Sequence, residues 1–448
     1  MNPKEFLLHE CENVLATLQD VLRHDYAAGS SKEFYNEFCE RLNYLKLLID
    51  PVELTDISAL ALFANEVSVL STLVHRIERS HAGEFPWPFT EYLKSLANPL
   101  CKEHLVVQDE DEPIIRVYAE GGLFSYQINL ENDLSVLNVG RRIFTIVFPR
   151  TLRHHVLLHA IFGHEIGHAA WAVPQHKSAL KGQVVEPLRE AGPLNSTSQA
   201  KNWLKQSDAP AAIVELLEAY PDEYSDISPN QLDSWFQEFM CDLFGLVTFG
   251  PSFLAAHQTL LLALDPSGCL WGPYHPPYVC RRVMLWRACQ HLGWPTFPAG
   301  IQDRELRASC EGFVKKYSGE APGKWEDIFS QEQIAKAVDA LRDILTKAGT
   351  SCYLMPDDPT LLPLVKMLHG QIPPCGSDLS GSEAPANRSV DFRHILFAGW
   401  LVADELSAQA TVTGEQSYFL ELNKLCEMGL LQQRAIDRYN DHKAGDKH

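Results

Sequence analysis

The sequence predicts a mostly α-helical fold of the α+β class, with one small β-sheet ahead of a central helix and helical regions on both sides. Two observations predict this fold. Apolar residues recur every three or four positions through most of the 448-residue chain, which is the spacing of helices that bury one face. One region instead has short β-branched and aromatic runs, broken by Gly-Gly and Asn/Asp-rich turns, which is typical of strands.

The first region, residues 1–105, is predicted to be helical. Its blocks ECENVLATLQDVL, EFYNEFCERLNYLKLLI and ISALALFANEVSVLSTLVHRI each have helical periodicity. The second region, residues 106–299, begins with predicted strands in PIIRVYAEGG, LFSYQINL and RRIFTIVFPR. The run RIFTIVFP is a candidate edge strand, to which an extended peptide could add through backbone hydrogen bonds.

The remainder of the chain is again predicted to be mainly helical. A polar stretch near residues 172–230 separates two strongly apolar helices and could be a loop or a lid. Residues 300–448 form a C-terminal helical region with a flexible linker near 375–389. The apolar stretch 246–264 has the length of a membrane span, but Pro251 within it and the absence of a basic flank favour a buried helix.

Composition argues against several kinds of partner. The chain has 58 acidic and 38 basic residues, a formal charge of -20, which repels nucleic-acid phosphates and anionic membranes. We therefore expect no nucleic-acid partner and no membrane insertion. The eleven cysteines include no CxxC pair, and the first residues lack the basic and apolar segments of a secretion signal. Reduced thiols and a cytoplasmic location are expected.

The segment HAIFGHEIGHAAW, residues 159–171, contains the pattern HExxH. Its histidines, His164 and His168, differ by about 40° around a helix, so both imidazoles can reach one metal ion. Glu165 lies on the adjacent flank, where it can take a proton from an attacking water without being a ligand. The alternative is a helix with paired surface or core histidines, because a chain with 18 histidines can contain this pattern by chance.

A catalytic zinc ion usually has three protein ligands, so a third ligand is expected elsewhere. The best candidate lies in SWFQEFMCDLFGLV, where Glu238 and Asp242 are four residues apart in an otherwise apolar helix. Burying unpaired carboxylates is costly, and a metal ion with a metal-binding imidazole removes that cost. We predict that Glu238 is the third ligand and that Asp242 accepts a hydrogen bond from a ligand histidine. The alternative is a carboxylate pair that caps other groups at a helix surface.

HExxH followed by ExxxD resembles the gluzincin zinc metallopeptidases, whose third ligand is a glutamate on a second helix. The segment YHPPYVCRRVMLW, residues 274–286, is similar to the HPPxxxR signature of the branch that contains the CAAX prenyl proteases and the HtpX heat-shock proteases. The resemblance covers residues 155–286 and implies a metallopeptidase core within 106–299. The members of that branch are mostly membrane proteins, whereas no membrane insertion is expected for this chain.

The resemblance implies roles for two further residues. His275 corresponds to the family histidine and Arg281 to its arginine, so one or both are expected near the active site, holding substrate or the developing oxyanion. His275 precedes two prolines, which predicts a rigid turn. The alternatives are that His275 is a turn residue only, and that Arg281 is a helix-surface charge or holds the turn by pairing with an acidic residue.

The sequence therefore predicts a zinc-dependent metallopeptidase, a hydrolase with one zinc ion per chain that cleaves an intracellular protein or peptide. In this hypothesis Glu165 is the general base, and zinc and His275 stabilise the oxyanion. One alternative is a catalytically silent, metallopeptidase-like binding or regulatory protein. Glu165 argues against it, because metal binding needs only the ligands. The other is a structural helical protein with a coincidental motif.

Overall fold

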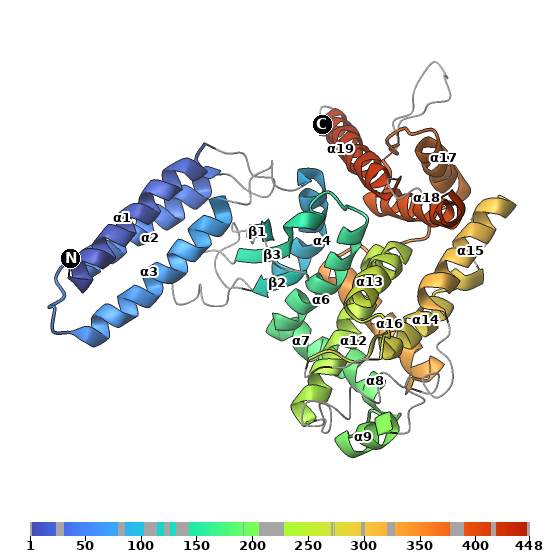
Figure 1. Cartoon of the computed structure of the whole chain (residues 1–448), viewed down its shortest axis with the longest axis horizontal. Helices are drawn as coiled ribbons and strands as arrows, with labels where there is room; N and C mark the ends of the chain where they lie inside the picture. Colours follow the sequence, from blue (N-terminus) through green and yellow to red (C-terminus); the bar gives the residue numbers. More distant parts are fainter. Residues whose placement is uncertain are drawn as a thin grey trace. The chain divides into compact units, whose positions relative to one another are not determined.

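The chain forms two compact units, Met1–Arg153 and His154–His448. The computed structural model describes residues 2–23, 31–78, 86–102, 114–120, 126–130, 143–190, 192–205, 228–269, 272, 274–296, 301–319, 328–376, 389–413 and 418–445. The fold is mostly helical, as predicted (Figure 1). The three regions expected from the sequence do not coincide with these two units, since the sheet falls in the first unit and the HExxH segment in the second.

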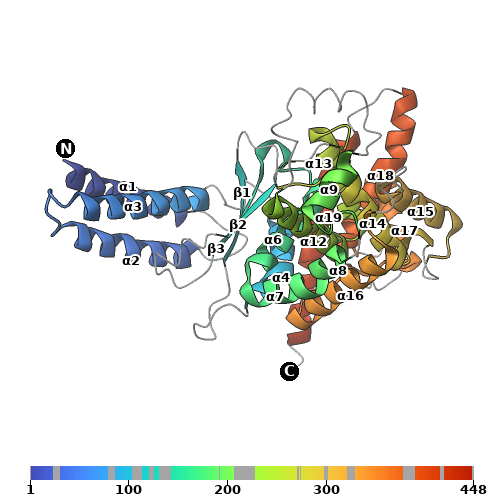
Figure 2. The ribbon, with the colours of Figure 1, turned by 90° about the horizontal axis from the view of Figure 1, so that it is seen from below.

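Three long helices, which lie side by side in both views, begin the first unit (Figures 1 and 2). They are α1 (Pro3–Val21), α2 (Ser31–Ile49) and α3 (Ile57–Glu78), and α4 (Trp87–Lys102) follows. The α1 helix begins with a capping box, in which Asn2 and Glu5 bond each other's backbone N–H groups. The core between the three helices consists of apolar side chains at helical spacing, including Leu7, Cys11, Val14, Leu18, Leu42, Leu45, Ile49, Leu60, Val67, Leu70 and Val74.

Within the described ranges, α3 is the one helix that is long and apolar enough to cross a membrane. The stretch Ile57–His75 has a mean hydropathy of 1.7, and 28% of it is buried. Core helices of soluble proteins meet the same criteria, so length and composition alone do not assign a span.

A three-stranded sheet completes the first unit. The strands are β1 (Ile114–Glu120), β2 (Gln127–Leu130) and β3 (Ile143–Pro149), in the order β1-β3-β2. The β3 strand pairs in parallel with β1 and antiparallel with β2. The expectation that RIFTIVFP forms an edge strand is therefore wrong, because β3 has a paired neighbour on both sides and presents no free edge to a peptide.

The second unit is built from helices. They are η2 (Leu158–Ile161), α6 (Phe162–Ala172), α7 (Pro174–Leu180), the π-helical η3 (Lys181–Val185), α8 (Glu186–Arg189), α9 (Thr197–Lys205), α12 (Pro229–Phe249), α13 (Pro251–Leu264), α14 (Tyr278–His291), η4 (Trp294–Thr296), α15 (Arg304–Ser318), α16 (Gln331–Ala348), α17 (Asp358–His369), α18 (Phe392–Thr413) and α19 (Tyr418–Gly445). A short helix η1 (Arg150–Leu152) ends the first unit.

Two predicted non-helical segments lie partly outside the described residues. The expected loop or lid at 172–230 contains the helices α7, η3, α8 and α9, and its residues 206–227 are not among those described. Most of the expected linker at 375–389, namely 377–388, likewise falls outside them.

The α12 helix forms the centre of the second unit, and almost every residue from Trp235 to its end is buried. The apolar stretch 246–264, expected as one buried helix, is instead divided between α12 and α13. Gly250 separates them with a φ of 66°, and Pro251 starts α13. Glycine adopts positive φ readily and proline favours the first turn of a helix, so this Gly-Pro pair produces a sharp corner between the buried end of α12 and the first half of α13, which is buried only to His257.

The segment that leads into α6 is held by the C-terminal helices. The Asn423 side chain of α19 accepts a hydrogen bond from the Leu157 backbone N–H at 3.0 Å. The Trp400 indole of α18 donates to the Leu157 carbonyl at 3.0 Å. Both backbone polar groups of the buried Leu157 are thereby satisfied, which fixes the segment that leads into the helix carrying HExxH.

Candidate metal centre

Helices α6 and α12 approach closely because glycines lie where they cross. A Cβ atom on Gly163 would lie 2.8 Å from the Cα of Gly245, and one on Gly167 would lie 3.0 Å from the Cα of Cys241. Real Cβ atoms essentially never approach within 3.0 Å of another heavy atom. Gly167 is itself inside HExxH. The close crossing brings a carboxylate of α12 within reach of the histidines on α6.

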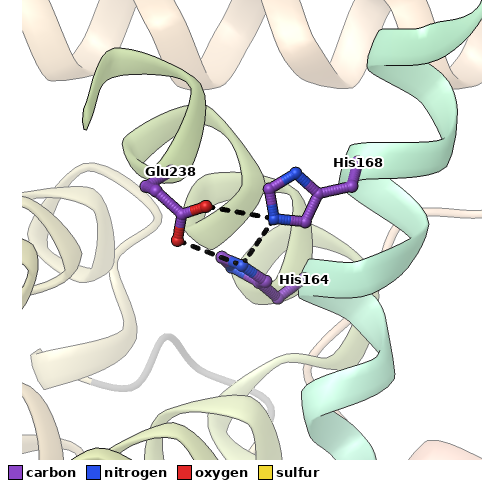
Figure 3. A group of neighbouring side chains, drawn as sticks. All are labelled: His164, His168 and Glu238. Atoms are coloured by element: carbon purple, nitrogen blue, oxygen red, sulfur yellow. Dashed lines mark hydrogen bonds and ion pairs between the residues drawn. The ribbon is translucent and has the colours of Figure 1, made fainter. Parts of the chain in front are cut away.

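The three predicted ligands converge at this crossing (Figure 3). His164 Nε2 lies 3.4 Å from Glu238 Oε2, His168 Nε2 lies 3.2 Å from Glu238 Oε1, and the two Nε2 atoms are 3.1 Å apart. A tetrahedral zinc site with bonds of about 2.0–2.2 Å has ligand–ligand separations of about 3.3–3.6 Å. The observed separations are within a few tenths of an ångström of those values, so the donor set fits a zinc ion.

The charges of this buried site call for a cation. Burial lowers the pKa of His164, but Glu238 and Asp242 outweigh it and raise that pKa to about 10. Burial likewise acts to raise the pKa of Glu238, yet His164, His168 and Arg281 hold it well below its usual range. Without a metal, His164 is therefore protonated and supplies the positive charge that a metal ion would otherwise bring.

One oxygen of Glu238 has no hydrogen-bond partner among the described residues. This atom, Oε2, is buried. Its nearest basic neighbours are His164 at 3.4 Å, Arg281 at 3.5 Å and His275 at 3.9 Å. Buried carboxylate oxygens nearly always have a donor or a cation as partner. Oε2 therefore has ion pairs but no aligned hydrogen bond within the described residues, so it remains available as a ligand for a metal ion.

Asp242 lies directly behind His164. Its Oδ1 atom is 2.9 Å from His164 Nδ1, so the carboxylate can accept a hydrogen bond from the Nδ1–H group and orient Nε2 toward the site, as metal-binding histidines require. Arg281 holds this carboxylate with two hydrogen bonds of 2.6 Å, from Nε to Oδ2 and from Nη2 to Oδ1. Burial opposes ionisation of Asp242, but the Arg281 guanidinium holds its pKa well below the usual range.

Arg281 lies beside the candidate site, as the resemblance implies, and it pairs with acidic residues, as one of the alternatives expected. Its side chain is 4% exposed, so it is neither a helix-surface charge nor open to substrate. Its polar contacts are with Asp242, Glu238 and His164. Arg281 thus acts as a positioning residue that orients Asp242, and through it His164.

His275 lies at the exposed side of the site. Its side chain is 66% exposed, and its Nε2 atom is 3.9 Å from Glu238 Oε2. The turn that carries it is tied to α12, because Gln231 and Trp235 each donate a hydrogen bond of 3.1 Å to the carbonyl of Gly272. The Gly272 N–H in turn donates to the His275 carbonyl at 2.9 Å. The turn is therefore anchored to the helix of Glu238, and His275 stays accessible to a bound molecule.

Glu165 follows His164 on α6 and is buried, with 8% of its surface exposed. Its role in proton transfer stays a prediction.

Two residues of the site were not foreseen from the sequence. Gln237 lies with its amide nitrogen 3.0 Å from His168 Nδ1, and His257 of α13 lies with Nε2 3.0 Å from Asp242 Oδ1. Neither His257 nitrogen has a well-aligned hydrogen bond within the described part of the chain. Burial lowers the pKa of His257 to about 4, so this ring is neutral. A histidine in the apolar run SFLAAHQTLLLAL was the available signal for it.

In the described part of the chain, His164, His168 and Glu238 form the one group of side chains that could hold a metal ion. Comparison with known proteins adds no family to this geometry. No protein-family model matches the chain, and neither the curated proteins nor the solved structures contain a match.

Proposed function

We propose that this protein is a zinc-dependent metallopeptidase that cleaves peptide bonds in a protein or peptide substrate. The observation that carries the proposal is the convergence of two imidazole nitrogens and one carboxylate at a buried point, with Asp242 behind His164. Three protein ligands of these types are typical of catalytic zinc, which keeps a position open. The likeness of HExxH, ExxxD and HPPxxxR to gluzincins supports the same proposal.

The zinc ion would be held by His164, His168 and Glu238. When bound, zinc would supply Lewis acidity, which polarises the substrate carbonyl and lowers the pKa of water, so that water gives up a proton and becomes a nucleophile near neutral pH.

The side chains around the proposed zinc ion have separate roles in the reaction. Glu165 accepts the proton of the attacking water and returns it to the leaving amine, so that one carboxylate serves both steps. His275 donates a hydrogen bond to the oxyanion, a role that its exposure and its anchored turn support. Asp242 keeps the His164 ring oriented, and Arg281 keeps Asp242 in place.

The test uses the full chain loaded with zinc and a peptide library, with cleavage products identified by mass spectrometry. We expect wild type to cleave peptides and Glu165→Gln to retain zinc while losing at least about a hundredfold in rate. The His164→Ala/His168→Ala double variant should lose both zinc and cleavage. Cleavage by Glu165→Gln at the wild-type rate would contradict the mechanism. Zinc binding with no cleavage by wild type would favour the catalytically silent alternative.

A further inference from the structure

The candidate metal centre opens to solvent on one side. The side chains of His164 and Glu238 are each 7% exposed, whereas those of His168 and His275 are 26% and 66% exposed. Glu238 Oε1 faces His168, and Oε2 faces His164 and His275. A substrate that reaches the proposed zinc ion therefore approaches across the side bounded by His168 and His275.

Trp171 lies nearly one helical turn beyond His168 on α6. Residues three apart on a helix are neighbours, with about 5–6 Å between their Cβ atoms. Around the helix axis, Trp171 lies about 20° to one side of His164 and His168 lies about 40° to the other, so the three side chains share one face. Trp171 is half-buried. Its indole therefore borders the open side of the site, next to His168.

A cation lies over the indole ring of Trp171. Lys177 Nζ is 5.7 Å from the centroid of the ring, a distance at which an aromatic face attracts an ammonium group. The chain folds back here because Val173 is extended between α6 and α7, and the Lys177 N–H donates to the Val173 carbonyl at 2.7 Å. Lys177 is exposed, and no carboxylate of the described residues forms an ion pair with it. Its charge is therefore held beside the site and is available to a ligand.

We infer that Trp171 and Lys177 form a subsite that binds a carboxylate of the peptide substrate. This inference rests on the proposed function, and it narrows the substrate class to peptides with an acidic group near the scissile bond. The formal charge of -20 repels acidic peptides at long range, so a local cation is what allows the site to hold one. An extended peptide covers about 3.4 Å per residue. The ammonium group can therefore meet a carboxylate a few residues from the carbonyl that is cleaved.

The carboxylate has two possible sources with the same chemistry. It belongs either to an Asp or Glu side chain of the substrate or to the free C-terminus of a peptide that is cut near its end. The first source predicts an endopeptidase with acidic specificity, and the second predicts a carboxypeptidase. Peptides with amidated C-termini distinguish the two sources.

Two substitutions separate this role from simple packing on the indole. Lys177→Met keeps most of the length and the apolar part of the side chain and removes the charge. Lys177→Glu reverses the charge. Lys366→Met is the matched control, because Lys366 is an exposed lysine of α17. Both lysines are exposed, so these changes should leave the fold intact.

The experiment compares peptides that differ only in Glu, Gln or Lys at each position near the scissile bond, with the C-terminus free or amidated. The full chain is loaded with zinc, and kcat and KM are measured for each peptide. We expect wild type to favour the carboxylate about 2- to 5-fold, the size of an exposed ion pair, through KM and less so at high salt. This ratio should fall to about one in Lys177→Met, favour Lys in Lys177→Glu, and stay at the wild-type value in Lys366→Met.

Peptide binding gives a second readout that needs no cleavage. Fluorescence anisotropy of labelled Glu-containing peptides and their Gln counterparts is measured on Glu165→Gln, with and without each Lys177 substitution. If wild type cleaves peptides with no preference for a carboxylate, or if Lys177→Met keeps that preference, the subsite is wrong and the peptidase function stands. If wild type cleaves no peptide, the proposed function is wrong. In that case tighter binding of the Glu peptides that Lys177→Met abolishes would support the subsite, and equal binding of both peptides would overturn it.

Discussion

His164 Nδ1 lies 2.9 Å from Asp242 Oδ1, and this contact joins the predicted metal ligand to a buried ion pair. Behind it, Arg281 binds both oxygens of the carboxylate at 2.6 Å. A single carboxylate on α12 therefore connects the ligand helix α6 to α14. Its removal should affect both the metal and the fold.

Asp242→Asn should lower the free energy of unfolding of the metal-free protein by about 3–5 kcal/mol, because Arg281 loses its buried counter-charge. Zinc binding should weaken about 10- to 100-fold, since His164 loses its carboxylate acceptor. Denaturant unfolding and chelator competition measure the two effects. Asp339→Asn is the control, because Asp339 is 62% exposed and its pair with His291 should contribute at most about 1 kcal/mol. Equal effects of the two substitutions would contradict the buried-pair account.

Zinc binding should release about one proton per ion near pH 8, because metal-free His164 is protonated and the ion displaces that proton. The pKa of His164 is raised from 6.5 to about 10 by Glu238 and Asp242 against the effect of burial. Calorimetric titrations in buffers of different ionisation enthalpy count the released protons. Heat that does not depend on the buffer would show that His164 carries no proton before the metal binds.

The same shift gives a pH dependence to the stability of the metal-free protein. Because the folded-state pKa of His164 is raised, its stabilising contribution is fully present below pH 6.5 and is lost as the pH rises toward 10. Unfolding experiments on metal-free wild type and His164→Ala should therefore differ most at low pH and converge at high pH. A difference that grows with pH would have the wrong sign.

Gly163→Ala should destabilise the second unit by about 1–3 kcal/mol, because the new Cβ would lie 2.8 Å from Gly245 Cα and 2.7 Å from the Phe249 ring. It should also weaken zinc binding, since α6 must move away from α12. Gly312→Ala is the matched control. A Cβ there meets nothing within 4 Å in the middle of α15, so this change should stabilise by about 0.5–1 kcal/mol. Thermal unfolding of both variants tests the close crossing of α6 and α12. If Gly163→Ala is as stable as Gly312→Ala, the close crossing is contradicted.

Several features of the site follow from the sequence because they depend on local helix geometry. The spacing of His164 and His168 places them on one face of any helix, and the cost of burying Glu238 and Asp242 implies partners for both. The structure brings these residues together. The Gly-Pro pair at 250–251 was also a local signal for a corner, although the apolar run around it suggested one continuous helix.

Other features depend on contacts between distant parts of the chain. The central position of β3 is set by strand order, which its own residues do not encode. The burial of Arg281 depends on how α14 packs against α12, and the Gln237 contact has no sequence signal because a glutamine on a helix is usually a surface residue. The hydrogen bonds of Leu157 with Trp400 of α18 and Asn423 of α19 likewise join residues far apart in sequence.

The central claim is that His164, His168 and Glu238 hold one zinc ion, and elemental analysis of dialysed full-length protein tests it most directly. The predicted result is one zinc per chain in wild type and none in the His164→Ala/His168→Ala variant. His154→Ala/His369→Ala is the control, because these histidines are 45% and 41% exposed, pair with glutamates away from the site and should leave zinc content unchanged. Stoichiometric zinc in the His164→Ala/His168→Ala variant, or no zinc in wild type refolded in its presence, would contradict the claim.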